Sequence, residues 1–145
     1  MTTGTTPRSR TTAIRLPRAL VNQLLNHAQL AGNAEVCGLI GSGGGIPERC
    51  YPVANIAAEP TTRYDMDPRG QIDALRAMRE HGEELFAIYH SHPTSPAVPS
   101  AIDRDAANYP DTLYLIVSLV TKGVLDLRGY YIRDSAILPV ELEIG

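Results

Sequence analysis

The sequence contains no tryptophan, one phenylalanine and only two cysteines among its 145 residues. A hydrophobic core therefore has to be mainly aliphatic, and hydrophobic residues make up 43% of the chain, which is typical of a globular protein. Cys37 and Cys50 are too few for a disulfide framework and form no C-x-x-C pair. This cysteine usage favours a reducing compartment, so we expect a cytoplasmic protein.

Long apolar runs and clusters of positive charge are also missing. The longest strongly apolar run, LYLIVSLV at 113–120, is far shorter than the roughly 20 residues of a membrane-spanning helix. A formal net charge of −3 without a basic stripe argues against nucleic-acid binding. Residues 1–12 lack the apolar stretch of a secretory signal. We predict a disordered tail over 1–12, a single domain over 13–145, and no membrane or nucleic-acid partner.

The spacing of apolar residues changes repeatedly between helix and strand patterns. Helical spacing predicts helices over 18–30 and 68–81, and a third helix over 100–109 begins at Ser100. Helices interspersed with strands predict an α/β or α+β sandwich, with a mixed β-sheet flanked by helices. Compact apolar or alternating runs predict the strands, which cover 13–17, 35–42, 46–55, 63–67, 85–90, 112–120, 124–132 and 136–144.

Two histidines, His90 and His92, stand at the carboxyl end of the apolar run LFAIYH. Because one residue separates them, their side chains point to the same side of an extended backbone. They could therefore share one metal ion, since imidazole is a common zinc ligand. A hydrogen-bonded or solvent-facing pair also explains the spacing, so the pair alone does not establish a metal site.

A carboxylate, Asp103, follows the histidines within reach of the same site. The loop over 93–99 is long enough to fold back and bring Asp103 against the two imidazoles. Two histidines and one carboxylate would leave the fourth position of a tetrahedral zinc open, as in catalytic sites. However, Ser100 and Asp103 also have the spacing of a helix capping box, which needs no metal. Both interpretations stay open, and Ser100 could serve both.

A hydrolytic metal site also needs a base that takes a proton from the attacking water and returns it to the leaving group. Glu35 is the candidate, because a carboxylate is out of keeping with the apolar run EVCGLIGS that it opens. A solvated residue at a loop–strand boundary is the alternative. We interpret Cys37 as a buried thiol rather than a fourth ligand, and His27 and His81 as surface residues of helices.

Together these residues resemble the JAMM motif of MPN-domain metalloproteases. The match consists of His90-x-His92, seven residues, Ser100, two residues and Asp103, with Glu35 upstream in EVCG. It extends over roughly 12–135, and RYDMDP and IYHSHPTSPAVPSAID are similar to phrases of the short, stand-alone bacterial members. The motifs of two other zinc families, P-C-x-x-C and H-E-x-x-H, are absent from the sequence.

The resemblance implies a cytidine-deaminase-like sandwich that binds Zn²⁺ and hydrolyses amide or isopeptide bonds. His90, His92 and Asp103 would be the zinc ligands, Glu35 the general acid/base, and Ser100 a donor to the oxyanion. Similar bacterial proteins cleave after the C-terminal Gly-Gly of ubiquitin-like sulfur-carrier proteins, so we expect such a partner, in sulfur transfer or cysteine synthesis. The alternatives are an isopeptidase or cell-wall peptide hydrolase of the same family, and a non-catalytic MPN interaction module. The intact motif argues against the module.

Overall fold

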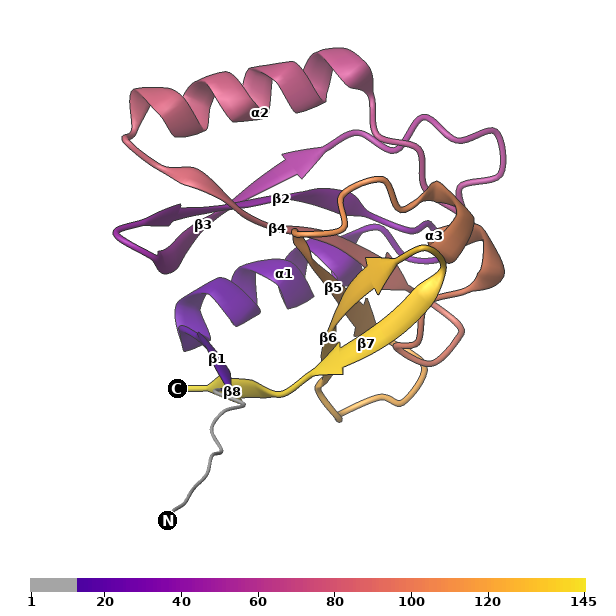
Figure 1. The fold of residues 1–145 in the computed structure, drawn as a ribbon. Coiled ribbons are helices and arrows are strands. Elements are labelled where there is room, and N and C mark those ends of the chain that lie inside the picture. The colour runs from indigo at the N-terminus through magenta and orange to yellow at the C-terminus, as the bar shows by residue number, and fades with distance from the viewer. Residues whose placement is uncertain (1–12) are drawn as a thin grey trace.

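Helices cover both faces of a mixed β-sheet, which gives three layers (Figure 1). This computed structural model describes residues 13–145, so the tail predicted over 1–12 lies outside the described residues. The elements in chain order are β1 (Ile14–Leu16), α1 (Arg18–Leu30), β2 (Cys37–Gly43), β3 (Ile46–Val53), α2 (Pro68–Glu80), β4 (Glu84–His92), α3 (Ala101–Ala106), β5 (Leu113–Ser118), β6 (Asp126–Arg133), β7 (Ala136–Val140) and β8 (Leu142–Ile144).

The main sheet has the strand order β3-β2-β4-β5-β6-β7. The strands β4 and β5 pair in parallel and the other neighbours pair antiparallel, so the chain crosses over between β4 and β5 through α3. The strands β1 and β8 form a separate parallel pair, in which Ile14 lies opposite Leu142. A mixed sheet flanked by helices confirms the predicted α/β class.

The central strand β4 is buried on both faces. Its residues Ala87 and Tyr89 belong to the core cluster under α1, whereas Ile88 packs in the cluster under α2. Successive side chains of a strand point to opposite faces, so a strand covered on both sides has a continuous apolar sequence. The same alternation puts His90 and His92 on one face, as their spacing predicts.

Capping side chains begin two of the helices. Asp67 Oδ1 accepts from the backbone N–H of Arg69 at 3.3 Å, with Pro68 in the first turn of α2. Ser100 Oγ accepts from the N–H of Asp103 at 3.0 Å, while Asp103 Oδ2 accepts from the N–H of Ser100 at 2.9 Å, which completes a capping box at α3. Within residues 13–145, no helix is long and apolar enough to cross a membrane.

Most predicted bounds lie within two residues of the observed ones, but three predicted elements differ more from the structure. The strand predicted over 63–67 is wrong, since only an isolated bridge joins Met66 to Asn55, and the N–H of Asp65 bonds to the Asn55 side chain. The third helix ends at Ala106 instead of 109. The strand predicted over 136–144 is interrupted at Glu141, and its two halves belong to different sheets.

Candidate metal centre

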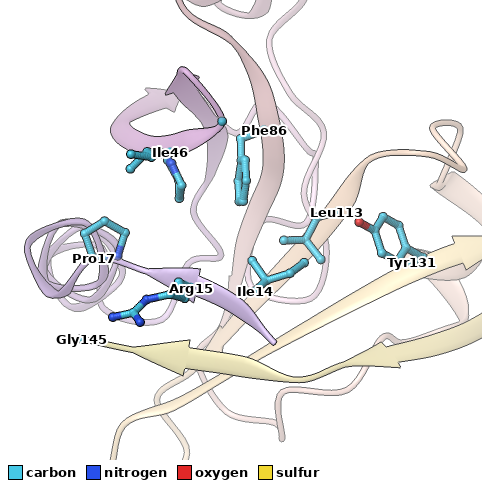
Figure 2. Close-up of a pocket in the computed structure, with 10 residues that line it drawn as sticks. Ile14, Arg15, Pro17, Ile46, Phe86, Leu113, Tyr131 and Gly145 are labelled. Atoms are coloured by element: carbon cyan, nitrogen blue, oxygen red, sulfur yellow. The ribbon is translucent and has the colours of Figure 1, made fainter. Parts of the chain in front are cut away.

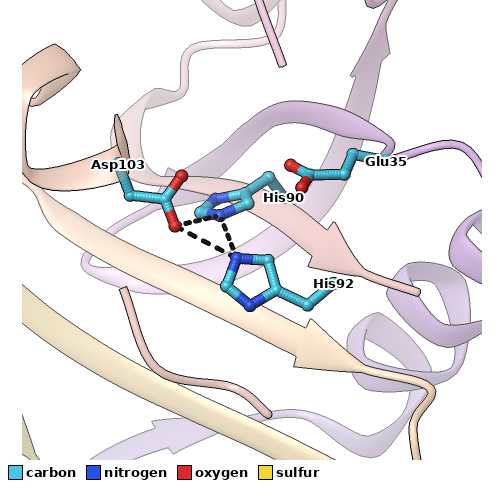
Figure 3. A group of neighbouring side chains, drawn as sticks. All are labelled: Glu35, His90, His92 and Asp103. Carbon is cyan, nitrogen blue, oxygen red and sulfur yellow. Dashed lines mark hydrogen bonds and ion pairs between the residues drawn. The ribbon is translucent and has the colours of Figure 1, made fainter. Parts of the chain in front are cut away.

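Four titratable side chains meet at the carboxyl end of β4 (Figure 3). His92 is the last residue of β4, and His90 is the third residue from its carboxyl end. Asp103 comes from α3, and Glu35 precedes β2. One ligand atom from each residue lies within 4.8 Å of the others, and all four residues are buried. The fold thus brings together the predicted ligands and the predicted base.

Three of the four residues have donor atoms and spacing that are compatible with a divalent metal ion such as zinc. The distances joining His90 Nε2, His92 Nε2 and Asp103 Oδ2 are 3.1, 3.1 and 3.0 Å. Ligands at about 2.0–2.1 Å from a tetrahedral zinc are separated by about 3.3 Å, which is close to these values. The three atoms therefore match one face of a zinc coordination tetrahedron.

The hydrogen bonding of His92 requires either a proton or a metal ion between its ring and Asp103. Its Nδ1 lies 2.7 Å from the carbonyl oxygen of Pro96, which can only accept, so Nδ1 carries the proton. In the neutral ring Nε2 then has a lone pair, and it faces the acceptor Asp103 Oδ2 at 3.0 Å. Two acceptors this close require a proton or a metal ion between them. A carbonyl bonded to the outer nitrogen is also usual for zinc-ligating histidines.

Ionisation of the three ligands follows their contacts. Burial alone would raise the pKa of Asp103, but hydrogen bonds with His90 and His92 hold that pKa far below its usual range. Burial lowers the pKa of His90. It acts in the same direction on His92, where hydrogen bonds to Asp103 and Pro96 outweigh it and raise the pKa. Asp103 is therefore a carboxylate, and His90 is neutral, which are the forms that bind a metal ion.

Glu35 faces the three ligands from the other side of the cluster (Figure 3). Glu35 as a whole residue is 5% exposed, which excludes the solvated alternative, and Oε1 is buried without a hydrogen-bond partner among the described residues. Burial raises the pKa of Glu35 to about 7, with Asp103 adding to the rise and His92 opposing it. A bound cation would lower this pKa again by attraction. A carboxylate of this kind is suited to accepting and returning a proton near neutral pH.

The main chain at Glu35 is tied to the strand that carries the histidines. The strand β2 begins at Cys37, so Glu35 lies in the preceding loop and not, as predicted, at the start of the strand. The N–H of Val36 donates to Ser91 Oγ at 2.9 Å, and the N–H of Ser91 donates to Val36 O at 3.0 Å. The sequence analysis missed Ser91, although a serine between two histidines in an apolar strand was an available signal.

The irregular stretch over residues 54–67, which we call the 54–67 segment, holds Glu35 from its other side. The N–H of Glu35 donates to Pro60 O at 2.7 Å, and Asn55 Nδ2 donates to Glu35 O at 3.0 Å. Both backbone groups of Glu35 are therefore bonded to this segment. The sequence analysis missed Asn55, because its partners lie far from it along the chain and no local pattern marks it.

Ser100 lies beside the ligands and is half-buried. Its N–H donates to Asp103 Oδ2, the oxygen that also faces both imidazoles. Its Oγ accepts from the N–H of Asp103, so the capping box leaves the hydroxyl hydrogen available for another acceptor. The capping and metal-site interpretations of these two residues are therefore compatible.

The other candidate residues are separate from the cluster. Cys37 is a buried thiol, as predicted, and donates to Val53 O at 3.4 Å; burial raises its pKa to about 12. His81 is exposed, as predicted. The prediction that His27 is a surface residue is wrong, because its half-buried ring places Nδ1 2.7 Å from the hydroxyl of Tyr89 in the core.

An apolar cavity of about 580 Å³ lies at the opposite end of the sheet (Figure 2). Its walls include Phe86 and Leu113, near the amino-terminal ends of β4 and β5, together with Ile14 and Tyr131. None of the four clustered residues lines it. The four clustered side chains and this apolar cavity are therefore at opposite ends of β4.

Sequence and structure comparisons relate the chain to known proteins. Residues 17–128 match Prok-JAB, described as prokaryotic homologs of the JAB domain. A protein of Haloferax volcanii named Desampylase is 41% identical over 103 residues, which are 67% of this chain and 74% of the relative. A protein of Mycobacterium tuberculosis named CysO-cysteine peptidase is 37% identical over 120 residues, covering 81% of this chain and 82% of the relative.

The fold is likewise shared with a solved protein. The solution structure of a protein from Desulfitobacterium hafniense is similar to this one with a TM-score of 0.83 and 34% sequence identity. The similarity covers 91% of this chain and 92% of that one.

Proposed function

Because this chain belongs to the family of prokaryotic homologs of the JAB domain, we propose that it is a zinc-dependent peptidase acting on a ubiquitin-like sulfur-carrier protein. The bond cleaved is the amide bond after the carrier's C-terminal Gly-Gly. The observation that carries this proposal is the buried cluster of Glu35, His90, His92 and Asp103. Three of its atoms have zinc-ligand spacing, and the fourth residue, Glu35, has a carboxyl oxygen, Oε1, without a hydrogen-bond partner among residues 13–145.

His90, His92 and Asp103 are the residues that would hold the zinc ion. When bound, zinc supplies Lewis-acid polarisation of the scissile carbonyl and makes water easier to deprotonate. Pro96 O orients the His92 ring through Nδ1, and the capping box orients the Asp103 carboxylate through the N–H of Ser100. The protein's own contribution to the metal site is thus a set of ligands whose orientations are largely fixed before substrate arrives.

Glu35 moves the proton. One of its carboxylate oxygens accepts the proton of the attacking water and then delivers it to the amine that leaves. General acid–base catalysis of this kind contributes about 10²–10⁴ in rate. Burial keeps Glu35 close to the cluster, and its backbone bonds to Pro60 and Asn55 hold it there.

Ser100 stabilises the negative charge that develops on the carbonyl oxygen of the scissile bond. The hydroxyl hydrogen left available by the capping box is the donor. Removing one donor of this type from an enzyme costs about 10²–10³ in kcat.

The substrate proposal is supported by the name of the Mycobacterium tuberculosis relative, CysO-cysteine peptidase, and by the chain's 37% identity to it. An extended Gly-Gly tail is a suitable substrate because glycine, which has no side chain, lets its backbone approach a buried metal site closely. We place the reaction in the cytoplasm, in sulfur transfer or cysteine synthesis. The free thiols of Cys37 and Cys50 are consistent with a reducing compartment.

The test compares zinc content and cleavage in the native protein, Glu35→Gln and Glu80→Gln. Glu80 is exposed at the end of α2, so its variant controls for the loss of a charge. Each protein is incubated with a carrier that ends in Gly-Gly-Cys, and the mass of the carrier is measured. We expect the native protein and Glu80→Gln to bind zinc and remove the last residue. Glu35→Gln should keep the zinc and lose at least about 10² in rate.

Each other outcome contradicts a defined part of the proposal. A zinc-loaded native protein that leaves this carrier intact but cuts an isopeptide-linked carrier conjugate would replace the substrate with that of the isopeptidase alternative. Retained cleavage by Glu35→Gln would remove Glu35 from the role of base. A native protein that binds neither zinc nor another divalent ion would contradict the metal-dependent mechanism.

A further inference from the structure

The 54–67 segment bonds to the backbone of Glu35, and it also contacts His90 through an aromatic side chain. The ring of Tyr64 stacks on the ring of His90, with 4.5 Å between the ring centroids and an angle of 29° between the planes. In the sequence Tyr64 belongs to RYDMDP at 63–68, where no local pattern predicts a contact with His90. Its position against a ligand therefore needs an explanation of its own.

The two histidines of the cluster are oriented by different means. His92 is held by the carbonyl of Pro96, whereas Nδ1 of His90 is buried and has no hydrogen-bond partner among residues 13–145. Metal-ligating histidines usually bond through the second nitrogen, which fixes the orientation of the ring. For His90 the stacked ring of Tyr64 takes this place, because rotation of the imidazole about its Cβ–Cγ bond would drive it into the tyrosine.

The residues before and after Tyr64 are both hydrogen-bonded to the side chain of Asn55. Asn55 Nδ2 donates to Arg63 O at 3.1 Å, and Asn55 Oδ1 accepts from the N–H of Asp65 at 2.9 Å. The same Nδ2 donates to Glu35 O. The backbone on either side of Tyr64 is thus anchored to the group that also anchors Glu35, and the tyrosine is not a loosely placed surface residue.

From this geometry we propose that Tyr64 is a positioning residue of the metal site, which holds the His90 ring in its ligating orientation by stacking. The inference deepens the proposed function and rests on its metal ligands. It requires the aromatic ring of Tyr64 but not its hydroxyl group. It also predicts that the effect of Tyr64 on metal binding is independent of any peptide substrate.

The test measures zinc affinity by competition with a chromophoric chelator, and the visible absorption spectrum of the cobalt(II)-substituted protein. Tyr64→Leu removes the ring, and Tyr64→Phe keeps the ring without the hydroxyl. Tyr109→Leu is the matched control, because Tyr109 lines the same small pocket as Tyr64 but is not stacked on His90. Should Tyr64→Leu fail to fold, Tyr64→Met replaces it, because the unbranched methionine side chain adapts to irregular space without supplying an aromatic ring.

We expect Tyr64→Leu to bind zinc about 10–100-fold more weakly and to change the cobalt spectrum, since losses of this size follow removal of groups that orient a ligand. Tyr64→Phe and Tyr109→Leu should match the native protein in both measurements. Native affinity and spectrum in Tyr64→Leu would overturn the inference. An equal loss in Tyr64→Phe would assign the effect to the hydroxyl, and an equal loss in Tyr109→Leu would assign it to the pocket; either result refutes stacking.

These measurements separate the inference from the proposed function. If zinc affinity depends on the Tyr64 ring but the carrier is never cleaved, the positioning role stands and the substrate proposal fails. If the native protein cleaves the carrier and Tyr64→Leu binds zinc normally, the function stands and the positioning role fails.

Discussion

At the scale of single residues, one carboxylate oxygen of Asp103 bonds both to the start of α3 and to the two histidines of the candidate metal site. Asp103 Oδ2 accepts from the N–H of Ser100 at 2.9 Å and lies 3.0–3.1 Å from Nε2 of His92 and His90. A capping residue normally stabilises only its own helix. Here the cap also sets the direction of the Asp103 side chain, so the order of α3 and the geometry of the site depend on the same bonds.

Replacing Ser100 with alanine should therefore have two effects. Loss of the acceptor at the helix start is expected to reduce the free energy of unfolding by about 0.5–2 kcal/mol. Loss of the hydroxyl donor is expected to reduce kcat by about 10²–10³. Chemical denaturation and carrier cleavage measure the two effects, and Ser100→Thr, which keeps a hydroxyl, should preserve most of both. A destabilised variant with native kcat would leave Ser100 as a helix cap only.

At the scale of elements, a segment without regular secondary structure contacts two of the four residues of the site. The 54–67 segment bonds to both backbone groups of Glu35 and stacks Tyr64 on His90. Its own shape depends on Asn55, whose amide makes four hydrogen bonds, to the backbone of Glu35, Arg63, Ala57 and Asp65. These bonds use the full capacity of an asparagine side chain.

Asn55→Ala should lower kcat by roughly 10–100-fold even at saturating zinc, because a small displacement of Glu35 from the reacting groups is costly. The variant should also lose about 1–3 kcal/mol of stability, since backbone groups are left unpaired. Asn26→Ala, on the exposed side of α1, is the control. Zinc-saturated kinetics and thermal unfolding provide the measurements, and an unchanged kcat would show that Glu35 keeps its place without Asn55.

A second link between elements joins the edge strand β3 to the start of β4. Glu83 is buried and accepts from the hydroxyl of Tyr51 at 2.5 Å and from Arg49 Nε at 3.1 Å, both on β3. The contact passes over Gly41 of β2, where a Cβ atom would lie 2.5 Å from Glu83 Oε1. Burial alone would raise the pKa of Glu83, but the bonds from Tyr51 and Arg49 outweigh it and lower the pKa.

This lowered pKa makes the contribution of Glu83 depend on pH. Its ionised form stabilises the fold above the unfolded-state pKa of about 4.3, and the stabilisation is lost as pH falls through the lower folded-state value. We expect Glu83→Gln to be less stable than the native protein by about 1–3 kcal/mol at pH 7. Denaturation from pH 7 to pH 3 should show this difference shrinking in acid. Glu84→Gln, at the exposed neighbouring position, should show no such pattern.

At the scale of the whole molecule, the hydrophobic core and the four clustered titratable residues are separate sets of side chains. The two core clusters, one under α1 and one under α2, contain none of the four clustered titratable residues. The described domain should consequently remain folded without metal. Zinc, which would bind the folded state at ligands from β4 and α3, adds stability by mass action.

Calorimetric melting in zinc and in a chelator tests this separation. Free zinc at 100 times its Kd should stabilise the native protein by about 2.7 kcal/mol, seen as a higher Tm. Chelation should lower the Tm without unfolding the protein at room temperature. Asp103→Asn, which removes one charged ligand, should lose most of the zinc-dependent increase. A protein that unfolds on chelation would instead be one whose fold depends on the metal.

The sequence by itself determined the features that depend on neighbouring residues. Apolar spacing gave α1 its bounds, alternation placed His90 and His92 on one face, and local capping chemistry began α2 and α3. These features follow from backbone geometry over one or two turns of helix or a few residues of strand, so the pattern of side chains is sufficient to predict them.

The tertiary structure alone decided which distant residues support the site. Asn55 and Tyr64 act through partners that lie far away in the sequence, and no local pattern distinguishes them from ordinary loop residues. The interruption at Glu141 and the burial of His27 also depend on distant partners. The strands on either side of Glu141 pair in different sheets, and the His27 ring contacts the hydroxyl of Tyr89. Contacts of this kind form only when distant parts of the chain pack together, because only then do backbone and side-chain groups find their remaining hydrogen-bond and packing partners.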